Sequence, residues 1–496
     1  TVHKGDLKNN TVTIRQDGAV ALAYGAFAED GGAMVGGDSA ADGNHAVIEG
    51  GRAEFVIGGA TNGTGKVSYN TVTVSGGEVG SAGVNNAGGA FGGASMGPGA
   101  GNVTHNSVTI AGGKIEGSVY GGYAVGTGNV TNNSVTIAGG RFENAGTAPD
   151  VYGGYAVGTG KTTGNTVSLG DAEHTDLRGA ALSSSAIYGG NKTDVTGNTL
   201  SVYGKNVAVK SVNNFESYDF KLNKTLANND VMLTVQDAGD FAGAGVDWSK
   251  VGVDRSAIDA DYLENIHGVR RVELLKSSTP NALHFKNYAV RNFGATDTHE
   301  SALMTDQDKD EATSVVWVVN RFKDGRVAFD GTAESEGGEL YGGISYDGHT
   351  TTGNVLTITG VHGANDPKYA FGGKNEGTTG DVTQNTVDIE LAHDADTIAE
   401  VYGGQANNAD GAGKVDGNIA NMKKGTVNLL YAGYTFGDGA VTNNTVNFSG
   451  GKSTGYIGGG YIDKAASTAE VSRNKVFFTD GTAGQIRGGV TIGSGA

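Results

Sequence analysis

Apolar and polar residues alternate over short stretches that return throughout the chain. In Thr71–Val74 threonine alternates with valine, and Ser134–Ile137 follows the same order of polar and apolar positions. A period of two predicts a β-strand with one buried face, and β-branched residues favour strands. The pattern therefore predicts many short strands, each with an inward apolar face and an outward polar face.

Each alternating stretch belongs to a larger repeat made of two half-motifs. The first begins with asparagine, as in Asn133-Ser-Val-Thr-Ile137, and in two copies continues with Ala-Gly-Gly. The second is an apolar residue, usually an aromatic residue and two glycines, as in Val151-Tyr-Gly-Gly154. Copies recur about every 30 residues, a period typical of solenoids and arrays. We expect the glycines to serve turns, because glycine adopts positive φ at little cost, so that each unit forms strand, turn, strand and loop.

One such unit cannot bury its own apolar face, so it must stack on its neighbours. A β-propeller blade needs four antiparallel strands and about 40 residues, more than these units supply. The sequence therefore predicts an all-β fold, a right-handed parallel β-solenoid (β-helix) with repeats of about 30 residues. Its coils should stack at about 4.8 Å, the spacing of strands in a sheet.

The repeat divides the chain into three predicted sections. Regular units occupy residues 1–205 and return over residues 331–496. One compressed copy is expected around 425–434. Between the two regular blocks, residues 206–330 should form irregular β coils or a small inserted module.

The middle section contains strand-like stretches and one acidic segment. The stretches are Asn214–Leu222, Asp230–Val235, Val269–Leu275 and Ser314–Val319. Residues 306–311 should be a solvated loop in which Asp306, Asp308 and Asp310 have the spacing of a calcium loop. Glu311 stands where an EF-hand needs glycine, and Trp317 stands where it needs glutamate, which excludes that motif. Loose calcium binding stays open beside a plain acidic loop.

Composition narrows the class of function. The chain has 35 basic and 53 acidic residues, a net charge of −18 and no run of lysine or arginine, so we expect no nucleic-acid partner. The absence of cysteine removes disulfides, thiolate metal sites and cysteine nucleophiles. No apolar run of about 20 residues and no leader at Thr1 is found, so the sequence is expected to be a mature or excised segment.

The repeat and one further segment carry a family resemblance. The tandem Asn-Thr-Val-Thr-Ile and Tyr-Gly-Gly units, with Val212–Leu226 followed by Asp230–Val235, resemble the passenger region of Gram-negative autotransporter (type V secretion) adhesins. The resemblance implies an extracellular, cell-surface location, a removed signal peptide and a C-terminal outer-membrane barrel. Contact with the membrane would come only through that anchor, which this sequence does not contain.

Two short motifs resemble catalytic or phosphate-binding loops but lack required parts. Gly37-Asp-Ser39 begins like a serine-protease nucleophile turn, but two alanines follow it and only His3 precedes it. Gly158–Thr162 ends like a phosphate-binding loop, but Tyr155 stands where the first glycine is required. The first segment is therefore not expected to be a protease site, and Gly158–Thr162 is predicted to be an ordinary inter-strand loop of the repeat.

Carbohydrate-cleaving β-helices are the enzyme alternative. They need carboxylates clustered on adjacent coils for acid and base roles. Here the stacking positions are asparagine, threonine, valine, tyrosine and glycine, while acidic residues fall in variable loops without register. We therefore predict no catalytic residue, no cofactor and no metal ligand.

Two columns of residues recur at one repeat position each. A tyrosine column should form an aromatic ladder that packs the coils, with binding of sugar faces as a second use; its members are Tyr120, Tyr152, Tyr188, Tyr341 and Tyr402. An asparagine column should form a structural amide ladder at the strand entrances; its members are Asn70, Asn106, Asn133, Asn165, Asn198, Asn385, Asn444 and Asn474.

These observations predict a non-enzymatic adhesin or stalk of a bacterial cell surface. Its partner would be a host or bacterial surface glycan or protein, bound through the tyrosine column, the middle section or the long loops 80–90, 144–150 and 391–399. Two alternatives remain: a self-assembling extracellular filament subunit, in which a homo-oligomer forms through uncapped solenoid ends, and a glycan-active β-helix enzyme.

Overall fold

The computed structural model describes residues 5–29, 31–81, 88–99, 101–144, 147–335, 337–363 and 366–492. Half of the chain lies in strands and 3% in helices, and parallel stacked sheets form a β-solenoid of about 16 turns. The predicted all-β parallel solenoid is confirmed, while its right hand stays a prediction. The chain divides into two compact units: residues 1–258, 272–290 and 303–317, and residues 259–271, 291–302 and 318–496.

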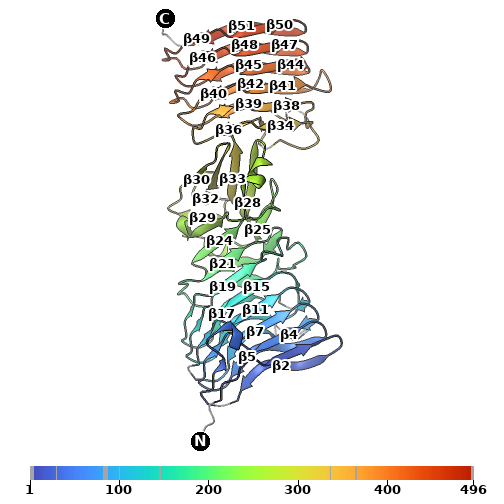
Figure 1. The fold of residues 1–496 in the computed structure, drawn as a ribbon, viewed down its shortest axis with the longest axis vertical. Helices are drawn as coiled ribbons and strands as arrows, with labels where there is room; N and C mark the ends of the chain where they lie inside the picture. The colour runs from blue at the N-terminus through green and yellow to red at the C-terminus, as the bar shows by residue number, and fades with distance from the viewer. Residues whose placement is uncertain are drawn as a thin grey trace. The chain divides into compact units, whose positions relative to one another are not determined.

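In the first unit the repeat coils add strands to three parallel sheets (Figure 1). The first sheet runs in the order β1 (Thr11–Ile14), β4 (His45–Ile48), β7 (Thr71–Val74), β11 (Ser107–Ile110), β15 (Ser134–Ile137), β19 (Thr166–Leu169), β21 (Thr199–Val202), β24 (Ser217–Lys221) and β27 (Val251–Asp254). The second is β18 (Thr162–Thr163), β14 (Val130–Thr131), β10 (Val103–Thr104), β6 (Val67–Ser68) and β3 (Val35–Gly36). The third is β16 (Arg141–Phe142), β12 (Lys114–Ile115), β8 (Glu78–Val79), β5 (Arg52–Thr61), β9 (Gly89–Ser95), β13 (Ser118–Ala124), β17 (Val151–Ala156), β20 (Ala186–Tyr188) and β23 (Ser211–Asn213), with β2 (Ala19–Ala28) paired to β5.

Identical positions of successive coils pair in register in the first sheet. Val108 pairs with Val135 and Ile110 with Ile137, and all four side chains are fully buried. Their apolar stack fills the inside of the coil, while the intervening residues face outward. The predicted two-residue alternation and inward facing are therefore confirmed.

The glycines have two different roles. After β15 the predicted glycine turn is present, since Gly140 has φ +87. In the second half-motif the prediction of a turn is wrong, because Gly121 and Gly122 lie inside strand β13. A Cβ on Gly122 would lie 2.6 Å from Asn133 Nδ2, so this glycine makes room for the asparagine.

The predicted strand-like stretches of the middle section all contain strands. They hold β24, β25 (Val231–Val235), β28 (Val269–Ser277) and β33 (Ser314–Arg321). The first sheet continues through β27 at Asp254, so solenoid stacking extends beyond residue 205. The section also contains β22 (Val207–Val209), β26 (Val246–Asp247), β29 (Leu283–Lys286), β30 (Arg291–Ala295), β31 (His299–Thr305) and β32 (Glu311–Ala312), and β29 pairs antiparallel with β32. The helices are η1 (Ala40–Asp42), η2 (Gly239–Phe241), η3 (Trp248–Lys250) and α1 (Ala260–Glu264).

The second unit repeats the three-sheet arrangement, and its coils stack in order in Figure 1. One sheet is β34 (Arg326–Phe329), β38 (Val355–Ile358), β41 (Thr386–Glu390), β44 (Ile419–Lys424), β47 (Thr445–Phe448) and β50 (Lys475–Phe478). Another is β35 (Glu339–Tyr341), β39 (Tyr369–Asn375), β42 (Thr397–Ala406), β45 (Thr426–Thr435), β48 (Lys452–Ile462) and β51 (Thr482–Thr491), with β36 (Ile344–Ser345) paired to β39. The third is β37 (Thr351–Thr352), β40 (Val382–Thr383), β43 (Val415–Asp416), β46 (Val441–Thr442) and β49 (Val471–Ser472).

The compressed copy expected around 425–434 is a full coil, so that prediction is wrong. The stretch Thr426–Leu429 resembles the first half-motif, but it belongs to β45 and pairs with Thr397–Glu400 of β42. The strand that occupies the first half-motif position is β44, which pairs with β41. Within the described residues, no helix is long and apolar enough to span a membrane.

Candidate functional site

The asparagine column forms a continuous chain of hydrogen bonds inside each unit. Asn106 Nδ2 donates to Asn133 Oδ1 over 3.1 Å, and the Asn106 main-chain N–H donates to the same oxygen over 3.0 Å. Asn133 repeats both bonds to Asn165. Asn133 Nδ2 also donates to the Val103 carbonyl over 3.0 Å. Each amide therefore satisfies buried backbone groups of its own and a neighbouring coil, which is a structural role.

The column is longer than the sequence pattern predicted. In the first unit it includes Asn10 and Asn44 as well as the predicted members through Asn198. In the second unit the bonds run Asn354, Asn385, Asn418, Asn444 and Asn474. Asn44 and Asn418 were missed: His45 and Ile419 follow them, whereas threonine or serine follows the predicted members other than Asn474, which Lys475 follows. Their position before an alternating strand was the available signal.

The predicted tyrosines belong to stacks that run from coil to coil, and all are partly buried except Tyr402, which is buried at 3% exposed. In the first unit Tyr120 stacks on Tyr152 at 5.3 Å between ring centroids, and Tyr152 stacks on Tyr188 at 4.6 Å. Phe91 extends the stack at 4.8 Å from Tyr120. These side chains are partly buried, apart from buried Phe91. We call these four residues the first aromatic column.

The second unit has its own stack, in which the two predicted tyrosines are separated by phenylalanine. Tyr341 stacks on Phe371 at 5.4 Å, Phe371 on Tyr402 at 5.4 Å, and Tyr402 on Tyr431 at 6.2 Å. Lys374 Nζ lies 4.5 Å from the Phe371 ring centroid and forms an ion pair with Glu376 at 2.7 Å. Tyr341 and Tyr402 therefore belong to one column, but they do not touch directly.

A second row of tyrosines supports the first column edge to face. Tyr123 stacks on Tyr155 at 5.7 Å, and Tyr155 meets Tyr152 at 5.0 Å with nearly perpendicular planes. Burial, the largest cause, raises the pKa of Tyr120 to about 12, so its hydroxyl stays neutral at physiological pH. Burial also raises the pKa of Tyr152, and the nearby Asp150 carboxylate acts in the same direction.

The structure describes the remaining predicted features only in part. His3, residues 82–87 of the loop 80–90, and residues 145–146 of the loop 144–150 lie outside the described residues. Gly158 packs beside the Gly126 carbonyl of the preceding coil, so its segment is a loop of the repeat. In the acidic loop, Asp306 Oδ1 accepts hydrogen bonds from the main chain of Thr313 and Ser314, each over 3.1 Å.

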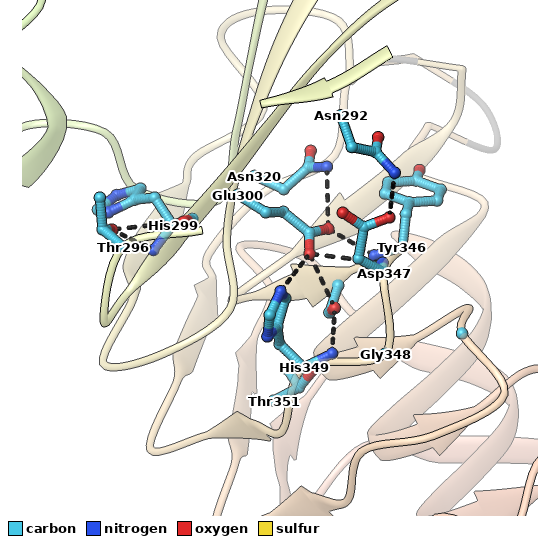
Figure 2. Close-up of polar contacts among 12 residues, drawn as sticks. Asn292, Thr296, His299, Glu300, Asn320, Tyr346, Asp347, Gly348, His349 and Thr351 are labelled. Carbon is cyan, nitrogen blue, oxygen red and sulfur yellow. Dashed lines mark hydrogen bonds and ion pairs between the residues drawn. The ribbon is translucent and has the colours of Figure 1, made fainter. Parts of the chain in front are cut away.

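One cluster that the sequence analysis missed lies in the second unit. Glu300 near the start of β31, with Asp347 and His349 in the turn between β36 and β37, places one ligand atom each within 4.8 Å of the others (Figure 2). The distance from His349 Nε2 to Glu300 Oε2 is 3.9 Å. Asn292 Nδ2 donates to Asp347 Oδ1 over 2.8 Å. Glu300 lies in the irregular middle section, 47 residues before Asp347, so no motif signals the cluster.

Glu300 is the buried member, with 4% of its surface exposed. Its carboxylate accepts from the Tyr346 main chain over 2.6 Å and from Ser345 Oγ over 3.1 Å. Burial raises the pKa of Glu300, and the negative charge of Asp347 adds to the shift. His299 precedes Glu300 but lies apart from the cluster in Figure 2, and its Nε2 faces the Ile266 carbonyl at 3.1 Å.

Comparison with known proteins gives no match to a family model, to a curated protein or to a solved structure.

Proposed function

We propose that this chain is a non-enzymatic attachment scaffold of a bacterial cell surface, of the autotransporter-passenger type expected from its repeats. The observation that carries the proposal is the first aromatic column, in which rings stack at 4.6 to 5.3 Å. Because the ring faces are covered by neighbours in the stack, a ligand would meet the ring edges and the hydroxyl groups, which suit the hydroxyl groups of sugars or the main chain of extended peptides. The inward positions, in contrast, stabilise the coils.

Ion pairing supports the non-enzymatic half of the proposal. Glu116, a buried carboxylate, pairs with Arg52 at 3.2 Å and with Lys114 at 2.6 Å. Asp219 and Asp254 lie on adjacent coils and share Lys221, at 2.6 and 3.1 Å. A glycosidase needs one carboxylic acid that can donate a proton and one carboxylate held opposite it. At both places a basic side chain holds the carboxylates in ion pairs, an arrangement that suits structure better than proton transfer.

The test of attachment replaces Tyr120, Tyr152 and Tyr188 together by alanine and measures binding to a glycan array and to host cells. We expect binding to fall at least about tenfold, since each lost stacking contact is worth about 0.5 to 1.5 kcal/mol. The matched control replaces Thr109, Thr136 and Ser168 by alanine; these outward residues stack in register in the same coils, on a different sheet. Unchanged binding by a folded triple-tyrosine variant would reject the column as the attachment surface.

A second variant covers the case in which the alanine substitutions unfold the coils. Phenylalanine stands at this repeat position naturally as Phe91, so replacing the same three tyrosines by phenylalanine should preserve the stack. We expect this variant to fold normally and to lose the part of the binding that depends on hydroxyl groups. The surface location is tested separately, by labelling intact cells of the source bacterium with antibody to this chain.

A further inference from the structure

We propose that Glu300, Asp347 and His349 form a binding site for one divalent transition-metal ion of the zinc type. The inference goes beyond attachment and does not depend on it. All three residues belong to the second unit, and Figure 2 shows their side chains converging. The site would connect β31 to the turn after β36. Glu300 and Asp347, its members in these two segments, are 47 residues apart in the sequence.

The ligand atoms are close enough for one ion to draw them together. They lie within 4.8 Å of one another, and His349 Nε2 is 3.9 Å from Glu300 Oε2. Zinc binds imidazole nitrogen and carboxylate oxygen at about 2.0 to 2.2 Å, which places ligand atoms about 3 to 3.5 Å apart. Asp347 is exposed and His349 is partly exposed on a turn, so both side chains have room for this small closure.

Glu300 is positioned in advance by the backbone. The hydrogen bonds from Tyr346 and Ser345 orient its carboxylate, as outer contacts orient the ligands of known metal sites. Its other two contacts, from the Asp347 main chain and from Asn320 Nδ2, are both long at 3.4 Å. These weak contacts leave lone pairs of a buried carboxylate available for a cation.

Asn320 gives an independent indication of a ligand. Its side chain is 4% exposed and faces Glu300, yet its Oδ1 has no hydrogen-bond partner among the described residues. Buried amide oxygens nearly always have a partner, and an ion or an ordered water is one explanation of an exception. Its Nδ2 faces Glu300 in Figure 2, and a half-turn of the amide about the Cβ–Cγ bond would exchange the places of oxygen and nitrogen. Asn320 Oδ1 would then face the cluster and contact the ion or a water bound to it.

The chemistry of the ligands selects the class of ion. Calcium and magnesium prefer oxygen ligands, whereas imidazole favours zinc and its neighbours among the transition metals. One imidazole and two carboxylates therefore fit Zn²⁺ better than Ca²⁺. Three protein side chains leave coordination positions to water, so the site is open.

The experiment is isothermal titration of the chelator-treated chain with Zn²⁺ alone, alongside a thermal unfolding series. We expect one equivalent of Zn²⁺ per chain and a Tm that rises with Zn²⁺ concentration, because the ion binds the folded state. His349→Ala and Asp347→Asn should each weaken Zn²⁺ binding by about 10- to 100-fold or more. Asp347→Asn keeps the oxygen that accepts from Asn292, so it should fold normally.

The matched control is His393→Ala. His393 is an exposed histidine of the same unit, and its main chain binds the neighbouring Asp396 carboxylate over 3.1 Å. This control should bind Zn²⁺ as the parent does. Absence of stoichiometric binding, an unchanged affinity in folded Asp347→Asn and His349→Ala, or preference for Ca²⁺ over Zn²⁺ would each overturn the assignment.

Discussion

Gly93 leaves the space that the Asn106 amide fills inside the same coil. A Cβ on Gly93 would lie 2.4 Å from Asn106 Cγ, closer than real Cβ contacts allow. The same relationship recurs between Gly373 and Asn385, again at 2.4 Å. The two half-motifs keep step along the sequence because the glycine of one must face the asparagine of the other. A substitution at either residue of the pair should therefore displace the other residue.

We predict that Gly93→Ala destabilises the first unit by about 1 to 3 kcal/mol, because an added methyl group in a filled space strains its neighbours. Thermal unfolding followed by circular dichroism measures the change. Gly179→Ala is the control, since nothing lies within 4 Å of a Cβ there. Equal Tm values for the two variants would show that Asn106 moves aside at little cost.

Ile137→Asp should destabilise its own coil and both neighbours by more than about 4 kcal/mol, because it buries a charge without a partner. Ile137 is fully buried between Ile110 and Leu169. Thr136→Asp, one residue earlier on the outward face, should change stability by less than about 1 kcal/mol. Limited proteolysis reports the local opening, and a parent-like digestion pattern in Ile137→Asp would contradict the assigned strand facing.

Tyr120 should make the first unit sensitive to alkali. Burial raises its pKa from the ordinary 10.0 to about 12, so the folded state favours the neutral phenol. Stability is then unaffected below pH 10 and falls as pH rises from 10 to 12, by about 2 to 3 kcal/mol. The stability difference between the parent chain and Tyr120→Phe, measured by denaturant unfolding at pH 9 and near pH 11.5, should shift in favour of the variant. A constant difference would contradict the burial of the hydroxyl.

Asp254 should contribute stability that acid removes. The Ser256 main chain donates to its carboxylate over 2.9 Å, and Lys221 pairs with it, which together lower its pKa from 3.8 to about 2. A lowered folded-state pKa means that the contribution is complete above about pH 4 and disappears as pH falls toward 2. Asp254→Asn should cost about 1 kcal/mol or less at pH 7, since water screens the partly exposed group, and nothing near pH 2.

Lys221→Met separates the two causes of that shift. The hydrogen bond from Ser256 is the larger cause, so this variant should keep most of the pH dependence. If the dependence vanishes with Lys221, the ion pair dominates. Unfolding midpoints measured from pH 2 to pH 7 distinguish the two results.

The sequence predicted the features that recur in every repeat, and it missed the features that depend on contacts made only once in the structure. Alternation in Ser134–Ile137 and the recurring asparagine sufficed for the strand facing, the parallel stacking and most of the amide chain. The coil that contains Thr426–Leu429 was misplaced because a strand of the second half-motif happens to share the composition of the first. Phe91 and Phe371 show that the aromatic position tolerates either ring, so tyrosine alone was too narrow a signal.

The Glu300 cluster could not be predicted for a physical reason. Its members come from the interrupted section and from a turn of the first coils after it, where no periodic spacing brings residues into register. Only the three-dimensional path of β31 places Glu300 against residues 345–349.

The hydrogen bonds of the asparagine column all run in one direction, so the number of coils can change without breaking the column. Every link from Asn44 to Asn165 donates in the same direction, and Asn106 and Asn133 are separated by 27 residues, one full coil. Removing residues 107–133 would join Asn106 directly to Ser134 and leave the next link, Asn165, in reach of the same donor. Recombination between repeats can therefore add or delete whole coils while every remaining hydrogen bond keeps its partner type, so that such genes can vary in length without redesigning the fold.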